Sequence, residues 1–138
     1  MTTPIAYDYE IVARFADLDP YGHVNATNYL DYVISSRWLF AKESLGITAD
    51  DFIKKGVGFF TAESRIEYRR PINGVQRLFV TSHVDRVEGA YMFVPFKIQT
   101  PDREKTFCTG ELKFAIMDLM TMKPQPMPEG VKPIFFNP

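Results

Sequence analysis

The chain is short of cysteine, of net charge and of long apolar runs, and each shortage excludes a class of protein. Its 138 residues include one cysteine, Cys108, so neither an internal disulfide nor a thiolate metal site can form. Such cysteine usage is typical of a reducing, cytoplasmic setting. The formal net charge of −1 gives no basic field for nucleic acid or an anionic membrane. No stretch approaches the roughly 18 apolar residues of a membrane span, and the N-terminus has no basic start followed by an apolar run.

Aromatic residues are plentiful instead, with 12 Phe and 7 Tyr in the chain. Side chains of this size form the apolar walls of a core, a pocket or a subunit interface. The length is that of one domain, so residues 1–138 are expected to form a single unit around one core.

The hydrophobic pattern predicts a strand and then two helices in the first half of the chain. Residues 7–15 are rich in Tyr, Ile and Val and predict a strand. From Ala26 to Leu45, apolar residues recur at helical spacing around all but a narrow polar side, which predicts a long, central helix of about 30 Å. Gly46 suits a left-handed helix end. A short helix is predicted over 49–55, with a capping box at its start.

The second half of the chain predicts strands and then a tail. Alternation with a period of two predicts a strand from Val57 to Pro71 with one buried face. Three further strands are predicted, over 77–88, 91–100 and 105–117. Within them, Pro95 predicts an edge position or a bulge, and Gly110 a bulge or a close backbone contact. Residues 119–138 are rich in proline and are expected to be extended on the surface.

These elements predict an α+β domain in which a five-stranded antiparallel sheet covers one long central helix. A sheet of this kind has open edges, and pairing two edges between subunits would close them. A homodimer with two-fold symmetry is therefore expected, and a tetramer is a further possibility.

Reactive and turn-forming side chains crowd between the first predicted strand and the long helix. Asp17 and Asp19 would repel one another in extended backbone, which would raise one pKa; alternatively, Asp17 bonds local backbone N–H groups as a turn acid. His23 could be a general base or could orient the loop. Asn25 could donate its amide to a substrate or to Asp19, or could cap the helix. Gly22 would permit positive φ or close approach of a substrate.

The run Asp17-Leu18-Asp19-Pro20-Tyr21-Gly22-His23-Val24-Asn25, followed by Asn28-Tyr29, resembles the signature of hotdog-fold acyl-CoA thioesterases, in particular the 4-hydroxybenzoyl-CoA thioesterase-like family. Residues 63–71 resemble the second strand of the same group, and the similarity covers roughly residues 7–117. The resemblance implies a sheet wrapped around a long helix, with sites formed at the interface of two subunits. It also implies that Asp19, the acid before a proline, is catalytic. The backbone N–H of Ala26, where related sequences often repeat Asn, would polarise the thioester carbonyl.

The implied reaction is hydrolysis of acyl-CoA to a free acid and CoA. Asp19 would act as general base on water or as direct nucleophile. The unpaired N–H groups and the positive end of the helix would stabilise the oxyanion. No metal is expected, because Asp17, Asp19 and His23 lack a recognisable ligand spacing, and no organic cofactor is expected either. An acyl-carrier-protein thioester is an alternative substrate, and the acyl group is open between aromatic and aliphatic.

Substrate contacts are expected on both sides of this loop, beginning with Asp17 and Gly22. Cations near the mouth would suit the phosphates of CoA, although a solvated charged face is the alternative. Aromatic side chains would line an acyl or aryl pocket, although core packing is the alternative. The other candidates are Tyr29, Phe59, Phe60, Arg65, Arg69 and Arg70.

Two other functions stay open at this point. A hotdog hydratase or dehydratase would use His23 as its base and would form product without releasing CoA. A non-catalytic acyl-thioester-binding protein would be stabilised by its ligand and would turn over no ester.

Overall fold

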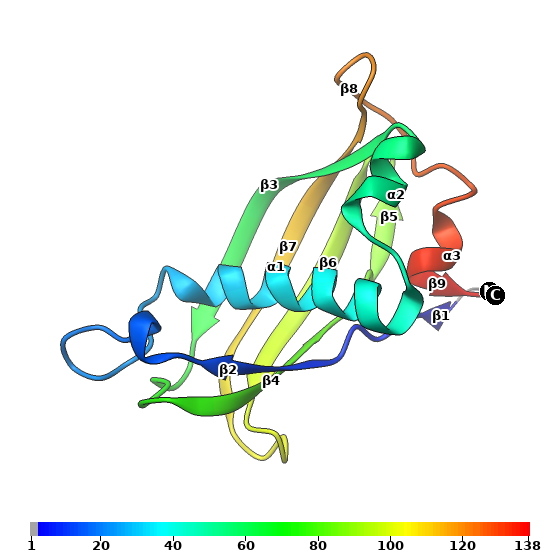
Figure 1. Ribbon diagram of the computed structural model, residues 1–138. Helices are drawn as coiled ribbons and strands as arrows, with labels where there is room; N and C mark the ends of the chain where they lie inside the picture. Colours follow the sequence, from blue (N-terminus) through cyan, green and yellow to red (C-terminus); the bar gives the residue numbers. More distant parts are fainter. Residues whose placement is uncertain (1–2) are drawn as a thin grey trace.

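Residues 3–138 are described by the computed structural model, and they form one curved antiparallel sheet with a long helix across its concave face (Figure 1). The order of strands in the sheet is β2 (Tyr9–Ala13), β4 (Gln76–Ser82), β6 (Tyr91–Gln99), β7 (Thr106–Asp118) and β3 (Val57–Tyr68). Short strands extend it, since β5 (Arg86–Glu88) pairs with β6 and β8 (Lys123–Pro124) pairs with β7. The predicted hotdog architecture, a sheet wrapped around a helix, is confirmed.

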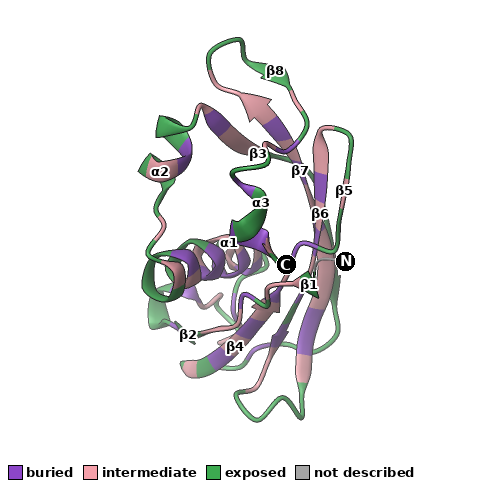
Figure 2. Cartoon of the chain, turned by 90° about the vertical axis from the view of Figure 1, so that its right-hand side faces the viewer, coloured by how far each residue is buried: buried purple, intermediate pink, exposed green. Residues whose placement is uncertain are grey.

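The core lies between the helix α1 (Asn28–Phe40) and the concave face of the sheet, and Figure 2 shows in purple the buried segments of the helix and of the strands. Strand β6 alternates as predicted, with one face buried. The buried residues of β6 are Met92, Val94, Phe96 and Ile98. Among residues 3–138, no helix is long and apolar enough to cross a membrane.

The central helix differs from its prediction at both ends. It begins at Asn28, two residues later than predicted, and after Phe40 it continues as a π-helical turn, Ala41–Leu45. Gly46 ends it with a φ of +68°, as expected. The prediction that little of the helix faces water is wrong near its C-terminal end, because Trp38 and Leu39 are exposed there.

The short helix α2 (Ala49–Lys54) confirms the second helical prediction to within a residue. Its capping box is present, because the Thr48 N–H donates to the Asp51 carboxylate at 2.8 Å. Its buried residue, Phe52, points toward α1 and the sheet.

Three strand predictions require correction. The first strand ends at Ala13, because residues 15–17 turn into a 3₁₀ helix. The strand predicted over 77–88 is two strands, β4 and β5, with a break at 83–85. Strand β3 has no buried face over residues 60–65, because β3 lies at the edge of the sheet.

Pro95 lies in a central strand, which corrects the expectation of an edge or a bulge. Strand β6 pairs with β7 along its length, and Pro95 lies opposite Glu111. On the other side, β4 ends its pairing at Phe96 and β5 begins at Phe93. Pro95 therefore faces the break between two partner strands, where its missing N–H removes no ladder hydrogen bond.

The C-terminal segment is folded into the core, which overturns the expectation of an extended surface tail. The short helix α3 (Lys132–Phe135) is followed by β9 (Phe136–Asn137), which pairs with β1 (Thr3–Pro4). The buried side chains of this segment are Met127, Val131, Ile134 and Phe135. Burial of these apolar groups outweighs the extended preference of the neighbouring prolines.

Candidate active site

The loop between β2 and α1 folds back on itself as a tight hairpin. Its two arms are joined at the Leu18–Val24 bridge. The Asp19 N–H donates to the His23 carbonyl at 2.7 Å, and the Asn25 N–H donates to the Asp17 carbonyl at 2.8 Å. The hairpin therefore places the acidic arm directly beside the arm that enters the helix.

Asp19 is oriented by the backbone of its own turn. One carboxylate oxygen, Oδ1, accepts hydrogen bonds from the Tyr21 N–H at 2.8 Å and the His23 N–H at 3.1 Å. The other oxygen has no hydrogen-bond partner among residues 3–138. The role expected of Asp17, bonding local backbone N–H groups, is therefore shared, because Asp17 accepts the Arg14 N–H at 3.1 Å and Asp19 accepts the two N–H groups of its turn. Asp19 is half-buried and keeps one carboxylate oxygen without a partner among the described residues.

Asp17 points into the protein and is only 3% exposed. Its carboxylate accepts hydrogen bonds from the Tyr32 hydroxyl at 2.7 Å, the Arg14 guanidinium at 3.0 Å and the Asn28 amide at 3.3 Å. Burial acts to raise the pKa of Asp17, but the hydrogen bonds from Arg14 and Tyr32 outweigh it and hold that pKa below its usual value. For Asp17 this is opposite to the direction expected from repulsion between two carboxylates. Through its hydrogen bonds with Tyr32 and Asn28, the Asp17 carboxylate connects the hairpin to α1.

The start of α1 presents one unpaired backbone donor to solvent, because the N–H groups of Thr27, Asn28 and Tyr29 are all bonded. The Ala26 N–H has no hydrogen-bond partner among the described residues, and Ala26 is exposed. The Asn25 side-chain oxygen accepts the Thr27 N–H at 3.0 Å, so Asn25 closes the turn before the helix. Thr27 itself stands at the N-cap position, without a side-chain cap. Asn28 is the first residue of the helix, and its side chain donates to Asp17.

A second loop holds the hairpin in place. The Val24 N–H donates to the Ile72 carbonyl at 2.9 Å, and the Gly74 N–H donates to the Gly22 carbonyl at 2.9 Å. Gly22 has a φ of +79°, which agrees with the conformation expected of it. His23 also pairs with Asn73 in an isolated β-bridge, so its backbone is fixed while its side chain stays half-buried.

The predicted aromatic contacts separate into three environments. Tyr29 is buried and packs edge-to-face on Tyr68, with ring centroids 4.9 Å apart. Phe59 packs on Phe52 and lines an internal cavity. Phe60, the next residue of β3, is exposed on the opposite face of the strand. Of the aromatic residues predicted to contact a substrate, Phe59 is the one that lines this cavity.

The predicted cations stay at the surface near the end of β3. Arg65 and Arg69 both form ion pairs with Glu67, at 3.0 and 3.2 Å. Arg70 is exposed, and its backbone N–H bonds the Phe107 carbonyl at 3.1 Å. Because Tyr68 packs on Tyr29 of α1, this charged strand end lies beside the start of the helix.

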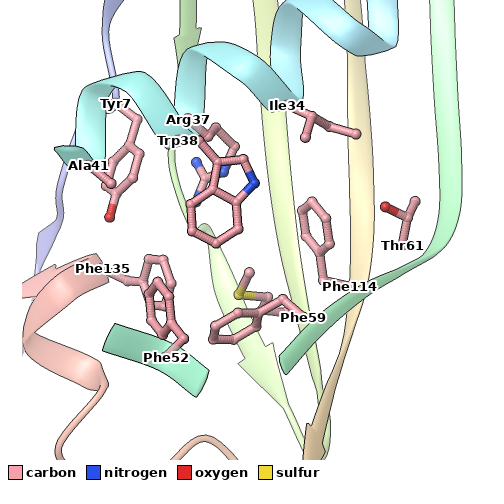
Figure 3. Close-up of a pocket in the computed structure, with 11 residues that line it drawn as sticks. Tyr7, Ile34, Arg37, Trp38, Ala41, Phe52, Phe59, Thr61, Phe114 and Phe135 are labelled. Carbon is pink, nitrogen blue, oxygen red and sulfur yellow. The ribbon is translucent and has the colours of Figure 1, made fainter. Parts of the chain in front are cut away.

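An internal cavity of about 120 Å³ lies along the C-terminal half of α1, away from the hairpin (Figure 3). Helices α1, α2 and α3 and strands β3, β6 and β7 contribute to its wall. The aromatic side chains that line it are Tyr7, Trp38, Phe52, Phe59, Phe114 and Phe135. The sequence predicted an aromatic-lined pocket and named Phe59 for it, but much of the remaining wall was missed, in part because Phe135 lies in the supposedly extended tail.

Arg37 also lines this cavity and was not among the predicted site residues. The signal was present in the sequence, since Arg37 was the one charged residue at the apolar spacing of the predicted helix. Within residues 3–138, no group of three or more His, Cys, Asp or Glu side chains is placed to hold a metal ion.

Comparison with known proteins agrees with the fold. The sequence profile of the Thioesterase-like superfamily matches residues 13–135. The long-chain acyl-CoA thioesterase FadM of Escherichia coli strain K12 is 26% identical over 117 residues, covering 83% of this chain and 85% of the relative. A 1,4-dihydroxy-2-naphthoyl-CoA thioesterase from Synechocystis superposes with a TM-score of 0.80 at 16% identity, covering 94% of each chain. The DHNA-CoA thioesterase from Staphylococcus aureus gives a TM-score of 0.76 at 21% identity, covering 88% of this chain and 80% of that one.

Proposed function

The chain belongs to the Thioesterase-like superfamily, and on that premise we propose that it hydrolyses acyl-CoA to a free carboxylic acid and CoA. One observation carries the proposal: the free carboxylate oxygen of Asp19 and the unpaired N–H of Ala26 lie on neighbouring arms of one fixed hairpin. Thioester hydrolysis needs these two parts, an activated attacker and a donor for the oxyanion.

In the proposed reaction, Asp19 takes a proton from water, which attacks the thioester carbonyl carbon. The alternative is direct attack by the Asp19 carboxylate, which forms an anhydride that water then hydrolyses. In either case the carbonyl oxygen gains negative charge and accepts the Ala26 N–H at the positive end of α1. The Asn25 side-chain amide nitrogen, free of partners among residues 3–138, is a second candidate donor. The carbon–sulfur bond then breaks and CoA leaves as its thiolate.

Asp17 and His23 have supporting parts in this proposal. Asp17 fixes the hairpin against α1 through Tyr32 and Arg14, so it positions Asp19 and does not touch the substrate. His23 holds Asp19 through its backbone N–H, which leaves the imidazole free to contact the substrate. Gly22 keeps the turn open to an approaching thioester.

The substrate is proposed to enter with its CoA portion over the basic end of β3 and its acyl portion toward the aromatic cavity. Arg65, Arg69 and Arg70 supply positive charge for the phosphates. The cavity, at about 120 Å³, approaches the roughly 150 Å³ of an apolar cavity that holds benzene. A ring or a compact acyl end fits such a space. An acyl-carrier-protein thioester would present the same reactive group to the same hairpin.

The active form is proposed to be a homodimer that pairs at β3. Residues 60–65 of this edge strand are exposed on both faces, and Phe60 adds a large apolar side chain. A two-fold related copy would cover this strand and satisfy its open edge. The same copy would add to the wall of the acyl pocket at β3, where Thr61 already lines the cavity.

The test is the release of free thiol from a panel of aryl and straight-chain acyl-CoA esters. Asp19→Asn keeps an acceptor oxygen for the turn but removes the base, so kcat should fall about 100-fold or more. Asp50→Asn is the matched control, since Asp50 is exposed in the first turn of α2, away from the hairpin. Chelators should leave turnover unchanged.

Three results would contradict the proposal. A folded Asp19→Asn protein with wild-type turnover would remove its central residue. Product formation without CoA release would indicate a hydratase or dehydratase. Stabilisation by acyl-CoA with no turnover of any ester would indicate a binding protein.

A further inference from the structure

A single arginine lies inside the apolar part of the molecule. Arg37, on α1, is 8% exposed, and its guanidinium lies 4.4 Å from the ring centroid of Tyr7. One terminal nitrogen donates to the Ser82 hydroxyl at 2.9 Å. Figure 3 shows the guanidinium beside Tyr7 and Trp38, at the wall of the cavity.

This cation has no carboxylate partner among residues 3–138; its one side-chain hydrogen bond there is to a neutral hydroxyl. Burial lowers the pKa of Arg37 to about 10, so the side chain is still charged at neutral pH. A buried charge without a counterion is destabilising, and such groups are normally paired. Arg37 can therefore bind an anion, and no carboxylate among residues 3–138 supplies one.

The unused donors of Arg37 open toward the cavity. A guanidinium carries five N–H donors, and the Ser82 contact uses one nitrogen. Among the described residues, no fully enclosed side-chain nitrogen or oxygen lacks a hydrogen-bond partner. The remaining nitrogens of Arg37 are consequently reachable from open space, and the open space beside them is the aromatic cavity.

Resting on the proposed function, we propose that Arg37 binds a carboxylate at the far end of the acyl group, so that the favoured substrates are thioesters of dicarboxylic acids. The aromatic wall would hold the apolar middle of the acyl group, and the guanidinium would hold its acidic end by charge-assisted hydrogen bonds. The separation of Ala26 and Arg37 agrees with a substrate whose thioester and far end bind at different places. Arg37 is eleven positions after Ala26, and the nine helical steps from Asn28 to Arg37 alone span about 14 Å along the axis, too far for one group to touch both.

Binding is tested first without any thioester, by calorimetric titration of octanoate and of its neutral analogue octanamide. The wild type should bind octanoate more tightly, and Arg37→Met should reduce that preference by roughly 10- to 100-fold, as expected for hydrogen bonds to a charged group. Arg103→Met is the matched control, because Arg103 lies 4.4 Å from the ring centroid of Phe79 but pairs with Asp8 outside the cavity.

Measurements of turnover then test whether the carboxylate that binds Arg37 is the far end of a substrate acyl group. For CoA esters of equal chain length, the wild type should give a higher kcat/KM for the ester with a terminal carboxylate than for the one with a terminal methyl. Arg37→Met should reverse this order, and Arg37→Lys should retain part of it. If Arg37→Met does not fold, Ser82→Ala tests the same site by releasing the guanidinium from its fixed position.

Each outcome is decisive. Equal binding of octanoate and octanamide by the wild type would overturn the carboxylate site. A wild type that prefers methyl-ended esters would overturn the assignment of dicarboxylic substrates. Arg37-dependent binding of octanoate by a protein that hydrolyses no ester would support the carboxylate site and would refute the thioesterase function instead.

Discussion

Asp17 and Asp19 are separated by one residue but occupy opposite environments. The 3₁₀ turn at residues 15–17 directs Asp17 inward, where Tyr32 and Arg14 donate to it. Asp19 follows in the hairpin and keeps one oxygen free. A motif of two acids therefore divides into a buried carboxylate with several partners and a carboxylate with one free oxygen, and the division depends on the backbone between them.

The Asp17–Tyr32 contact predicts a stability that depends on pH. Folding lowers the pKa of Asp17, so in acid the unfolded chain binds more protons than the folded chain. The stability from this carboxylate is therefore present above its unfolded pKa of about 3.9, and it is lost as the pH falls through the lower folded value. Tyr32→Phe should cost about 1–3 kcal/mol of unfolding free energy at pH 7, and less at pH 2–3.

Urea unfolding at the two pH values measures both effects. Tyr21→Phe is the control for loss of a hydroxyl, since Tyr21 is 84% exposed and should show no change at either pH. A cost for Tyr32→Phe that is equal at both pH values would show that the carboxylate is not the partner that matters.

The sequence identified this loop because its residues are close together along the chain. Turn formers and a following helix predict a hairpin beside a helix start, and the structure has both. The separate environments of Asp17 and Asp19 could not be predicted, because Tyr32 approaches from the second turn of α1. Arg37 shows the same limit: its position on an apolar stripe was visible, but the cavity beside it is built by residues up to Phe135.

Among the strands, alternation with a period of two predicted where a strand lies in the sequence more accurately than whether one of its faces is buried. Strand β6 buries the face that its alternation predicts. Strand β3 has an equally regular pattern, but it lies at the edge and is exposed over residues 60–65. Alternation reports which residues share a face, whereas burial depends on what covers that face.

Gly110 is the point at which two neighbouring strands approach too closely for any side chain. It pairs with Ile66 of β3, and a Cβ added there would overlap the Arg65 carbonyl oxygen and lie 2.5 Å from the Phe96 ring. The close backbone contact expected from the sequence is confirmed. Gly110→Ala should destabilise the protein by about 1–3 kcal/mol or more, because the backbone of β3 must move.

Thermal or urea unfolding of Gly110→Ala beside Gly130→Ala tests this contact. A Cβ at Gly130 would meet nothing within 4 Å, and the residue is not in the left-handed region, so that variant should keep wild-type stability. Equal stability of the two variants would show that β3 and β7 can separate at this point without cost.

For the whole molecule, the uneven distribution of burial is the basis of the proposed dimer. The cavity and the core are closed by elements from both ends of the chain, including β1, β9 and α3. The β3 edge, by contrast, is left uncovered: its residues 60–65 are exposed and lie beside the proposed entrance for CoA. An enzyme that needs a dry acyl pocket gains by covering this edge with a second copy.

The dimer is tested by sedimentation equilibrium, which should give twice the 15.9 kDa mass of one chain. Phe60→Lys places a charge on the β3 surface and, by repulsion across a two-fold axis, should weaken association at least about tenfold. Val12→Lys is the control, because Val12 is 52% exposed on β2, the strand at the opposite edge of the sheet, and the change should leave the dimer intact. Because the acyl pocket is proposed to span both subunits, the turnover of Phe60→Lys should fall in proportion to the fraction of dimer that is lost. A wild-type monomer that hydrolyses acyl-CoA at full rate would show instead that one chain carries the whole site.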